Sequence, residues 1–289
     1  MLIPLVLAAV LWAPDWLFIL LTGSVALLTA EEYLKIVAAH GITTFRRLVL
    51  VMLGSMFATA AICAYLPTPL NAILIWAYRT GAPLLVLLVL SMVLSFCLAM
   101  FSLPLRSVLP SVAATWLAFI YVGFPFACVA FIRAMSWYLA ALLLFLVWAG
   151  DILAYYVGST IGKHYMAPTI SPKKTWEGAI ASLVSSVLVG GALWYMAVPI
   201  QFEAQKVWVR PQGPAVFEQA PLWLVLVISV VINIAAQLGD LAESALKRGA
   251  EMKDSGGLLP GHGGMLDRVD ALLFAAPVAM LLFVILRVG

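Results

Sequence analysis

Residues 134–157, AMSWYLAALLLFLVWAGDILAYYV, decide the fold class. This run has 24 residues, and its one charged side chain is Asp151. A helix of about 20 mainly apolar residues is long enough to cross the hydrocarbon core of a bilayer. An ionisable group inside such a helix is costly in free energy and is by default a functional-site hypothesis. The run therefore predicts a membrane-spanning helix with Asp151 as a candidate functional residue.

Apolar runs of similar length recur on both sides of this one. They lie near 47–66, 83–103, 108–130, 178–200, 221–239 and 269–288. Two shorter runs, 1–13 and 16–30, flank Pro14-Asp15 and predict either a helical hairpin or one broken span. The chain has 65% hydrophobic residues, against roughly 45–50% in a soluble domain. These features predict an all-α, polytopic integral membrane protein with about nine transmembrane helices.

Basic residues predict the orientation in the membrane. With nine spans and the N-terminus inside, the inside loops carry 11 Lys and Arg residues and the outside loops carry five. Lys and Arg are in excess in cytoplasmic loops, so the loops after residues 161 and 249 are expected in the cytoplasm. The short loops favour a bacterial plasma (inner) membrane. The net charge of +3 gives no reason to expect a nucleic-acid partner, and three scattered cysteines indicate neither a disulfide framework nor a thiolate zinc site.

The distribution of charge divides the chain into two parts. Residues 1–140 have short connections and few charged side chains, mostly at helix ends, and are predicted to be a scaffold of transmembrane helices. In residues 141–289, acids enter or abut the spans, beginning with Asp151, so this part is predicted to hold the functional site. The segment 201–220, which contains Pro211 and Pro214, is predicted to be an exposed outer loop.

The longest polar stretch is Ser244 to Asp270, SALKRGAEMKDSGGLLPGHGGMLDRVD, with eight charged residues and one histidine. Just before and within it, Asp240, Glu243, Ser244 and Lys247 are spaced so that a helix places all four on one face. Such a face is typical of a functional site, but also of a solvated helix end with an ion pair from Glu243 to Lys247. The spacing alone leaves both interpretations open.

Glycines follow this face at high density, five of them within residues 256–264. Glycine lets backbone N–H groups approach a ligand, and successive free N–H groups can bind an anion. Flanking basic residues favour phosphate, although an ordinary flexible loop has the same composition. These basic residues are Lys247, Arg248, Lys253 and Arg268. No GxxxxGK[ST] or GxGxxG motif occurs, so the stretch is not a P-loop or a dinucleotide fingerprint.

Four aspartates could bind Mg²⁺ near such a phosphate site. Mg²⁺ is usually held by one or two carboxylates together with substrate oxygens. The four are Asp240, Asp254, Asp267 and Asp270. Asp267 and Asp270 also have a simpler interpretation, as favourable charges at the N-terminus of the last helix. His262 is expected to be a hydrogen-bonding loop residue rather than a ligand, because Mg²⁺ prefers oxygen.

A second polar segment, SPKKTWEG, spans Ser171 to Gly178. Ser171 before Pro172 predicts a helix start. Lysines and hydroxyl groups at a helix N-terminus would form a second anion site, from Ser171, Lys173, Lys174 and Thr175. A basic cytoplasmic loop anchored by Trp176 at the interface is the alternative.

Taken together, these motifs resemble the phosphatidate cytidylyltransferase (CDP-diacylglycerol synthase) family. Ser244–Asp270 matches the signature of that family, and Ser171–Gly178 matches its SPKKTWEG element. Gly239-Asp240-Leu241 and Asp151 with Ala154-Tyr155 match two further motifs. The resemblance covers residues 148–289, whereas residues 1–140 share only several spans and a helix end at Glu31-Glu32-Tyr33.

The resemblance implies cytidylyl transfer from CTP to phosphatidic acid, giving CDP-diacylglycerol and pyrophosphate with Mg²⁺. It implies metal ligands at Asp240 and Asp267, with K⁺ as a candidate second ion, and Asp254 and Asp270 as further candidates. The candidate catalytic residues are Asp240, Asp267, Lys247, Arg248 and Lys253. The candidate substrate-binding residues are Ser171, Lys173, Lys174, Thr175, Ser244, Gly261, His262, Gly263, Gly264 and Arg268. The expected partners are CTP, phosphatidic acid, membrane lipids and a second copy of the chain in a homodimer.

Two other functions fit the same residues. A CTP-dependent polyprenol or lipid kinase needs similar cations and carboxylates, and would release CDP instead of pyrophosphate. A membrane ion or lipid transporter would place its acids near the bilayer midplane. The acids of this chain instead cluster at one predicted cytoplasmic end among phosphate-type loops, which favours an enzyme.

Overall fold

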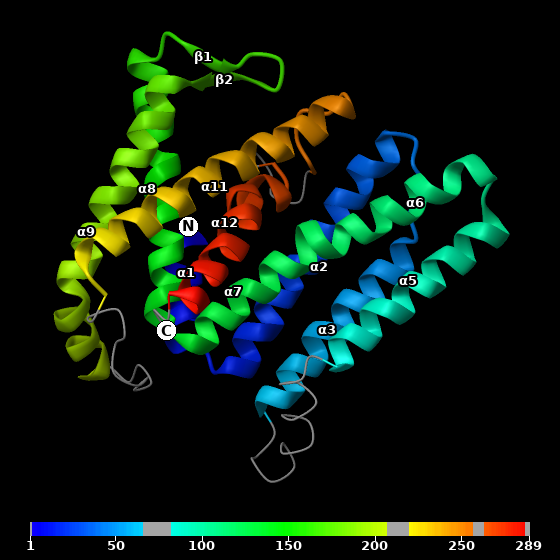
Figure 1. Ribbon diagram of the computed structural model, residues 1–289, viewed down its shortest axis with the longest axis horizontal. Helices are drawn as coiled ribbons and strands as arrows, with labels where there is room; N and C mark the ends of the chain where they lie inside the picture. The colour runs from blue at the N-terminus through cyan, green and yellow to red at the C-terminus, as the bar shows by residue number, and fades with distance from the viewer. Residues whose placement is uncertain (1, 66–81, 207–219, 257–262, 287–289) are drawn as a thin grey trace. The chain divides into compact units, whose positions relative to one another are not determined.

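The computed structural model describes residues 2–65, 82–206, 220–256 and 263–286 (Figure 1). In this part of the chain, every regular element except one two-stranded hairpin is a helix. Seven helices are long and apolar enough to cross a membrane, and two further apolar helices, Ile3–Trp12 and Leu88–Ser102, are shorter. The prediction of an all-α polytopic membrane protein is therefore confirmed.

The chain packs into two compact units. The first unit consists of Met1–Ala13, Cys128–Ala245 and Val269–Gly289, and the second of Pro14–Ala127 and Leu246–Arg268. The first contains α1 (Leu2–Trp12), most of α7 (Phe124–Met135), α8 (Trp137–Ile161), β1 (Tyr165–Ala167), β2 (Ser171–Thr175), α9 (Trp176–Lys206) and most of α11 (Leu222–Gly249) and α12 (Leu266–Ile285). The second contains α2 (Asp15–Ala39), α3 (Arg46–Tyr65), α5 (Ala82–Ser102), α6 (Leu105–Leu117) and the π-helix η1 (Ala118–Gly123). The functional division at residue 140 stays a prediction.

A buried polar network joins three helices of the first unit. Asn233 of α11 donates from Nδ2 to Ser182 Oγ (2.9 Å) and Ser186 Oγ (2.8 Å) of α9. Ser186 Oγ in turn donates to Leu146 O of α8 at 2.9 Å. A Cβ at Gly150 would lie 2.6 Å from Asn233 Nδ2, so a glycine is needed where α8 meets this network. Polar groups in an apolar interior must be paired, and the network satisfies this requirement between the helices.

The first helix of the second unit is longer than the sequence predicts. The apolar run ends near residue 30, but α2 continues to Ala39 through Glu31, Glu32 and Lys35. The charged turn remains helical because its acids have partners, as Glu31 shows by pairing with Arg46 Nη2 at 2.6 Å. Pro14 precedes α2 in an extended conformation and separates α2 from α1, so residues 2–30 belong to two helices, and the choice between a helical hairpin and one broken span stays a prediction.

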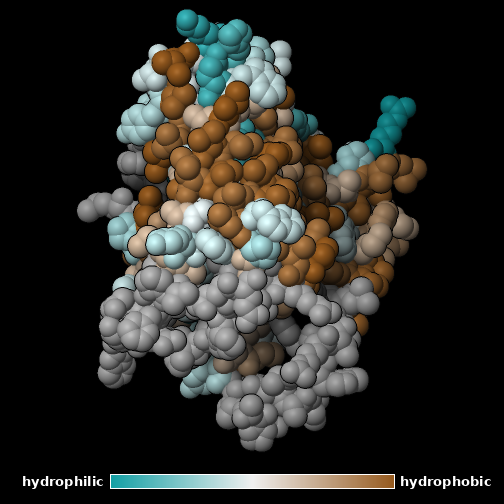
Figure 2. All heavy atoms as spheres, turned by 60° about the vertical axis from the view of Figure 1, so that its left-hand side comes forward, coloured by the Kyte–Doolittle hydropathy of each residue, from teal (hydrophilic) through white to brown (hydrophobic). Residues whose placement is uncertain are grey.

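The outer face of α8 and α9 is apolar. Figure 2 turns this side forward and shows a broad apolar area below the strongly hydrophilic side chains at the top of the view. Exposed side chains on these helices include Ile152, Ile180, Val184 and Leu188, which is 68% exposed. An apolar surface of this kind is compatible with lipid rather than water.

Two adjacent glycines of α9 provide a test of its packing against α11. A Cβ at Gly190 would lie 2.1 Å from Ser229 Oγ, whereas the nearest atom to a Cβ at Gly191 is Leu226 Cδ2 at 3.4 Å. We expect Gly190→Ala to lower the free energy of unfolding by about 1–3 kcal/mol, because the Ser229 hydroxyl must give up its hydrogen bond to Val225 O or α9 must move away from it. Gly191→Ala serves as the control and is expected to leave stability unchanged or higher by up to about 1 kcal/mol. Thermal unfolding of both variants in detergent checks this, and equal midpoints would contradict it.

Candidate functional site

A short hairpin connects α8 to α9. β1 and β2 pair antiparallel, with Tyr165 opposite Thr175 and Ala167 opposite Ser171. The helix start predicted at Ser171 is wrong, because Ser171–Thr175 is a strand and α9 begins at Trp176. Thr175 Oγ1 instead accepts a hydrogen bond from Gly178 N at 3.2 Å, so the threonine caps the helix.

The base of the hairpin is closed by contacts close to the helix ends. His164 Nδ1 lies 2.6 Å from Glu177 Oε1, and Trp176 N donates to His164 O at 2.9 Å. A Cβ at Gly162 would lie 2.3 Å from Gly158 O and 2.6 Å from Thr175 Oγ1. Glycine at this position therefore lets the chain leave α8 and return directly over its last turn.

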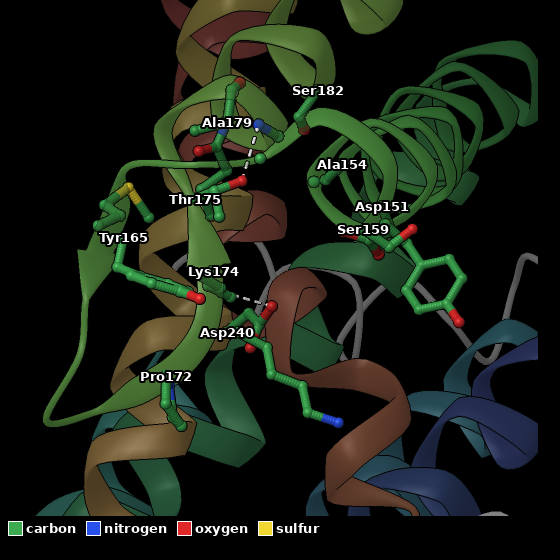
Figure 3. Close-up of a pocket in the computed structure, with 17 residues that line it drawn as sticks. Asp151, Ala154, Ser159, Tyr165, Pro172, Lys174, Thr175, Ala179, Ser182 and Asp240 are labelled. Atoms are coloured by element: carbon green, nitrogen blue, oxygen red, sulfur yellow. Dashed lines mark hydrogen bonds and ion pairs between the residues drawn. The ribbon is translucent and has the colours of Figure 1, made fainter.

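The hairpin brings Lys174 to Asp240 of α11. Lys174 Nζ lies 2.5 Å from Asp240 Oδ2, and both side chains are partly exposed (Figure 3). The pair borders a cavity of about 510 Å³, whose polar lining includes Asp151, Lys173, Ser182 and Gln237. The cavity is thus lined by the second half of α8, by the hairpin with the first turns of α9, and by the second half of α11. It brings together four of the predicted residues: Asp151, Lys173, Lys174 and Asp240.

Four acids of the first unit are linked by electrostatic interactions, and we call them the carboxylate cluster: Asp151, Asp240, Glu243 and Asp270. Asp270 interacts electrostatically with the other three, and Asp151 interacts with Asp240 and Lys174. A Cβ at Gly239 would lie 2.6 Å from Asp270 O, so only glycine lets α11 approach α12 closely enough for Asp240 to lie near Asp270. Glu243 is fully buried, which the interpretation of a solvated helix end did not anticipate.

In the second unit, Asp267 accepts hydrogen bonds from several protein donors. Lys247 Nζ lies 2.5 Å from Oδ1, and Oδ2 accepts from Ser255 N (3.0 Å), Ser255 Oγ (3.0 Å) and Gly264 N (2.7 Å). The sequence pointed to Lys247, Gly264 and Asp267, and the structure brings these three together. The Gly264 N–H donates to the Asp267 carboxylate, and its predicted role in phosphate binding stays a prediction.

Glu32 of α2 is a buried residue of this unit that the sequence did not single out. It is 4% exposed, and its Oε2 accepts from Leu266 N (2.8 Å) and shares the single hydroxyl hydrogen of Ser255, whose Oγ lies 2.9 Å away, with Asp267. The glutamate therefore holds both the loop at Ser255 and the first N–H of α12. Its only signal in the sequence is an acid in a helix that is otherwise mostly apolar, and its neighbour Glu31 shares that signal.

The remaining predicted site residues are placed as follows. Ser244 Oγ lies 3.5 Å from Asp240 Oδ1, a weak contact. Arg248, Lys253, Asp254 and Arg268 are exposed in the second unit. Gly263 has a positive φ of 76°, which glycine adopts readily. Gly261 and His262 lie outside the described residues.

Glu31 and Glu32 form a matched pair for testing the role of burial. Glu32→Ala leaves the buried Leu266 N–H without its acceptor, whereas Ser255 Oγ keeps Asp267, so we expect the free energy of unfolding to fall by about 1–3 kcal/mol. Glu31 makes a more exposed pair with Arg46, so Glu31→Ala should stay within about 1 kcal/mol of the wild type. Thermal unfolding of the purified variants measures both, and a larger loss in Glu31→Ala would refute this account of Glu32.

Comparison with known proteins shows the family of this chain. The Cytidylyltransferase family profile matches residues 1–286. Phosphatidate cytidylyltransferases of Staphylococcus saprophyticus and Staphylococcus haemolyticus are 35% identical over 168 and 167 residues, respectively. The phosphatidate cytidylyltransferase of Staphylococcus aureus strain COL is 35% identical over 167 residues. Each match covers 58% of this chain and 56% of the relative, little more than half of its length. Because the family profile spans nearly all of its residues, the chain belongs to the Cytidylyltransferase family.

Proposed function

We propose that the chain transfers the cytidylyl group of CTP to phosphatidic acid, giving CDP-diacylglycerol and pyrophosphate. The observation that carries this proposal is the cavity bordered by the Lys174–Asp240 pair, in which lysines for phosphate and carboxylates for a cation lie together. The family and the names of the staphylococcal relatives support the nucleotide and the lipid acceptor.

The chemistry requires positioning and charge neutralisation more than a protein base. A phosphate oxygen of phosphatidic acid attacks the α-phosphorus of CTP, and the bond from that phosphorus to the pyrophosphate oxygen breaks. A phosphomonoester has a second pKa near 6, so at pH 7 the nucleophile is already mostly a dianion. The main barrier is the repulsion between this dianion and the triphosphate, and fixed cations lower it.

The hairpin provides such cations. Lys174 is held by Asp240, and Lys173 is exposed and lines the same cavity. Lysine is a compact positive charge with three donors, which suits binding to phosphate oxygens. We infer that Lys173 and Lys174 bind the phosphates of the two substrates and orient the α-phosphate toward the acceptor.

The carboxylate cluster fits a divalent cation. It holds four acids, of which Asp240 is paired with Lys174, so added positive charge would be favourable. Among the described residues, no three His, Cys, Asp or Glu side chains are arranged to hold a metal ion. Mg²⁺ usually takes only one or two protein carboxylates, however, and substrate oxygens complete its shell. Asp240 would hold Mg²⁺, with Asp151 and Asp270 as neighbouring carboxylates. Bound there, the ion would neutralise phosphate charge that develops during transfer.

Asp267 is less accessible to a cation. Its Oδ2 already accepts three hydrogen bonds, so an ion would have to share Oδ1 with Lys247. The metal role of Asp267, that of the exposed Asp254 and a second ion such as K⁺ stay predictions. A cytoplasmic active site in a bacterial plasma membrane and a homodimer likewise belong to this proposal and rest on the sequence.

The proposal is tested by product analysis of detergent-purified protein with CTP and dioleoyl phosphatidic acid, with and without Mg²⁺. We expect pyrophosphate and CDP-diacylglycerol only when CTP, lipid and Mg²⁺ are all present, and loss of both products when EDTA removes the metal. Release of CDP with a phosphorylated acceptor would instead identify a lipid kinase. No product from folded protein would overturn the proposal.

Asp240 is the residue whose charge the proposal depends on most. Asp240→Asn keeps the size of the side chain and removes the charge that holds Lys174 and would hold Mg²⁺. We expect kcat to fall by at least about tenfold, or 1.4 kcal/mol of barrier. Glu31→Gln removes a charge from the second unit outside this site and is the control, expected to keep near-normal kcat. Near-normal turnover of Asp240→Asn would rule out a metal-binding role for Asp240.

A further inference from the structure

The cavity has a polar wall formed by Ser182 of α9 and Gln237 of α11. Neither residue belongs to a motif that the sequence singled out. Gln237 lies three residues before Asp240, so both side chains share one face of α11. The polar wall is therefore next to the ion pair at the border of the same cavity.

Hydrogen bonds to one backbone carbonyl and one side-chain oxygen set the orientation of the Gln237 amide. Nε2 donates to Ala179 O at 3.2 Å and to Asn233 Oδ1 at 2.7 Å. A backbone carbonyl can only accept, so the nitrogen must face Ala179, and both amide hydrogens are used. Within the described part of the chain, Oε1 has no donor. Gln237 thus presents an acceptor with a defined orientation.

Ser182 presents the complementary group. Asn233 Nδ2 donates to Ser182 Oγ at 2.9 Å and lies 3.3 Å from Ser182 O, which can only accept, so the Asn233 amide is oriented as well. The Ser182 hydroxyl therefore accepts from Asn233 and keeps its own hydrogen, for which no acceptor is found among the residues that the structure describes. Ser182 is 2% exposed and is among the residues that line the cavity, so we assign this hydrogen as the donor of the polar wall.

We infer that the polar wall recognises the base of the nucleotide, an assignment that rests on the proposed function. Cytosine presents an exocyclic amine, a donor, beside the ring acceptor N3. Gln237 Oε1 would accept from the amine, and the Ser182 hydroxyl would donate to N3. Uracil presents an acceptor and a donor in the reverse order, so O4 would face Oε1 and the uracil N3–H would face the serine. A site built to pair with one pattern rejects the other because its buried groups are left unpaired.

The surroundings suit a base with its phosphates. The cavity of about 510 Å³ lies within the usual range of small-molecule sites, which is roughly 300–1,000 Å³. Tyr155 and Tyr165 line it and are largely exposed, so their rings are available to stack on a base. Lys173 and Lys174 line the same cavity and would take the phosphates.

The test is the ratio of kcat/KM for CTP to that for UTP, measured by nucleotidyl transfer to dioleoyl phosphatidic acid. The variants are Gln237→Met and Ser182→Ala. Ser185→Ala is the control, because Ser185 is a buried hydroxyl of α9 that donates to Ala149 O (3.1 Å) and Ser182 O (2.8 Å) and is not among the residues that line the cavity. Loss of general packing would lower both rates together and leave the ratio unchanged.

We expect the wild type to prefer CTP, and each wall variant to lose about tenfold or more of that preference, while Ser185→Ala keeps it. The assignment would be overturned if both variants kept the wild-type ratio of kcat/KM for CTP to that for UTP. It would also be overturned if the wild type used UTP as well as CTP, or if only the KM for phosphatidic acid changed. Should Gln237→Met fail to fold, Ser182→Ala decides alone. No CDP-diacylglycerol from the wild type would instead defeat the proposed function and this assignment with it.

Discussion

The cost of an unpaired charge in an apolar helix bundle is the constraint on which the first unit depends. Asp151 and Asp240 lie in helices that are otherwise mostly apolar, and an ionised carboxylate there needs a compensating charge. The chain provides it by leaving α8 at Gly162, forming a hairpin and placing Lys174 within 2.5 Å of Asp240. This contact depends on the local geometry of the hairpin, which is set by the strand at Ser171, the threonine cap of α9 and the close approach at Gly162.

The two units satisfy their acids in different ways. In the second unit, Glu32 and Asp267 accept from backbone N–H groups at and before the start of α12, from Ser255 and, in the case of Asp267, from Lys247. Unpaired N–H groups at a helix N-terminus favour negative charge, so these two acids stabilise the local fold. In the first unit, the acids of the carboxylate cluster interact electrostatically, and two of the four, Asp151 and Asp240, line the cavity. The proposed metal site therefore lies in the first unit, whereas the contacts of Glu32 and Asp267 hold the local fold of the second.

Much of this could be predicted from single residues and their spacing. The apolar runs predicted the long helices, and the spacing of Asp240, Glu243, Ser244 and Lys247 predicted one helix through all four, as α11 confirms.

The hairpin could not be predicted, because Ser171-Pro172 has the composition of a helix start and only pairing with Tyr165–Ala167 makes it a strand. Glu32 was not singled out because its neighbour Glu31 has the same local sequence, and only packing buries Glu32 while leaving Glu31 partly exposed. The network of Asn233, Ser182 and Gln237 was missed because Ser, Asn and Gln scattered through apolar helices carry no local signal.

The sequence by itself determined the membrane class, the approximate helices, the family and most of the charged residues that meet at the cavity. These properties depend on hydropathy and on residue type, which are local quantities. Only the tertiary structure decided that Lys174 pairs with Asp240, that Asp267 is held by Lys247 and the N-terminus of α12, and that Gln237 presents an oxygen rather than a nitrogen. The physical reason is that each of these outcomes depends on which partner lies within hydrogen-bonding distance across helices. That distance is set by the packing of small residues such as Gly162 and Gly239, not by the spacing of charges along the chain.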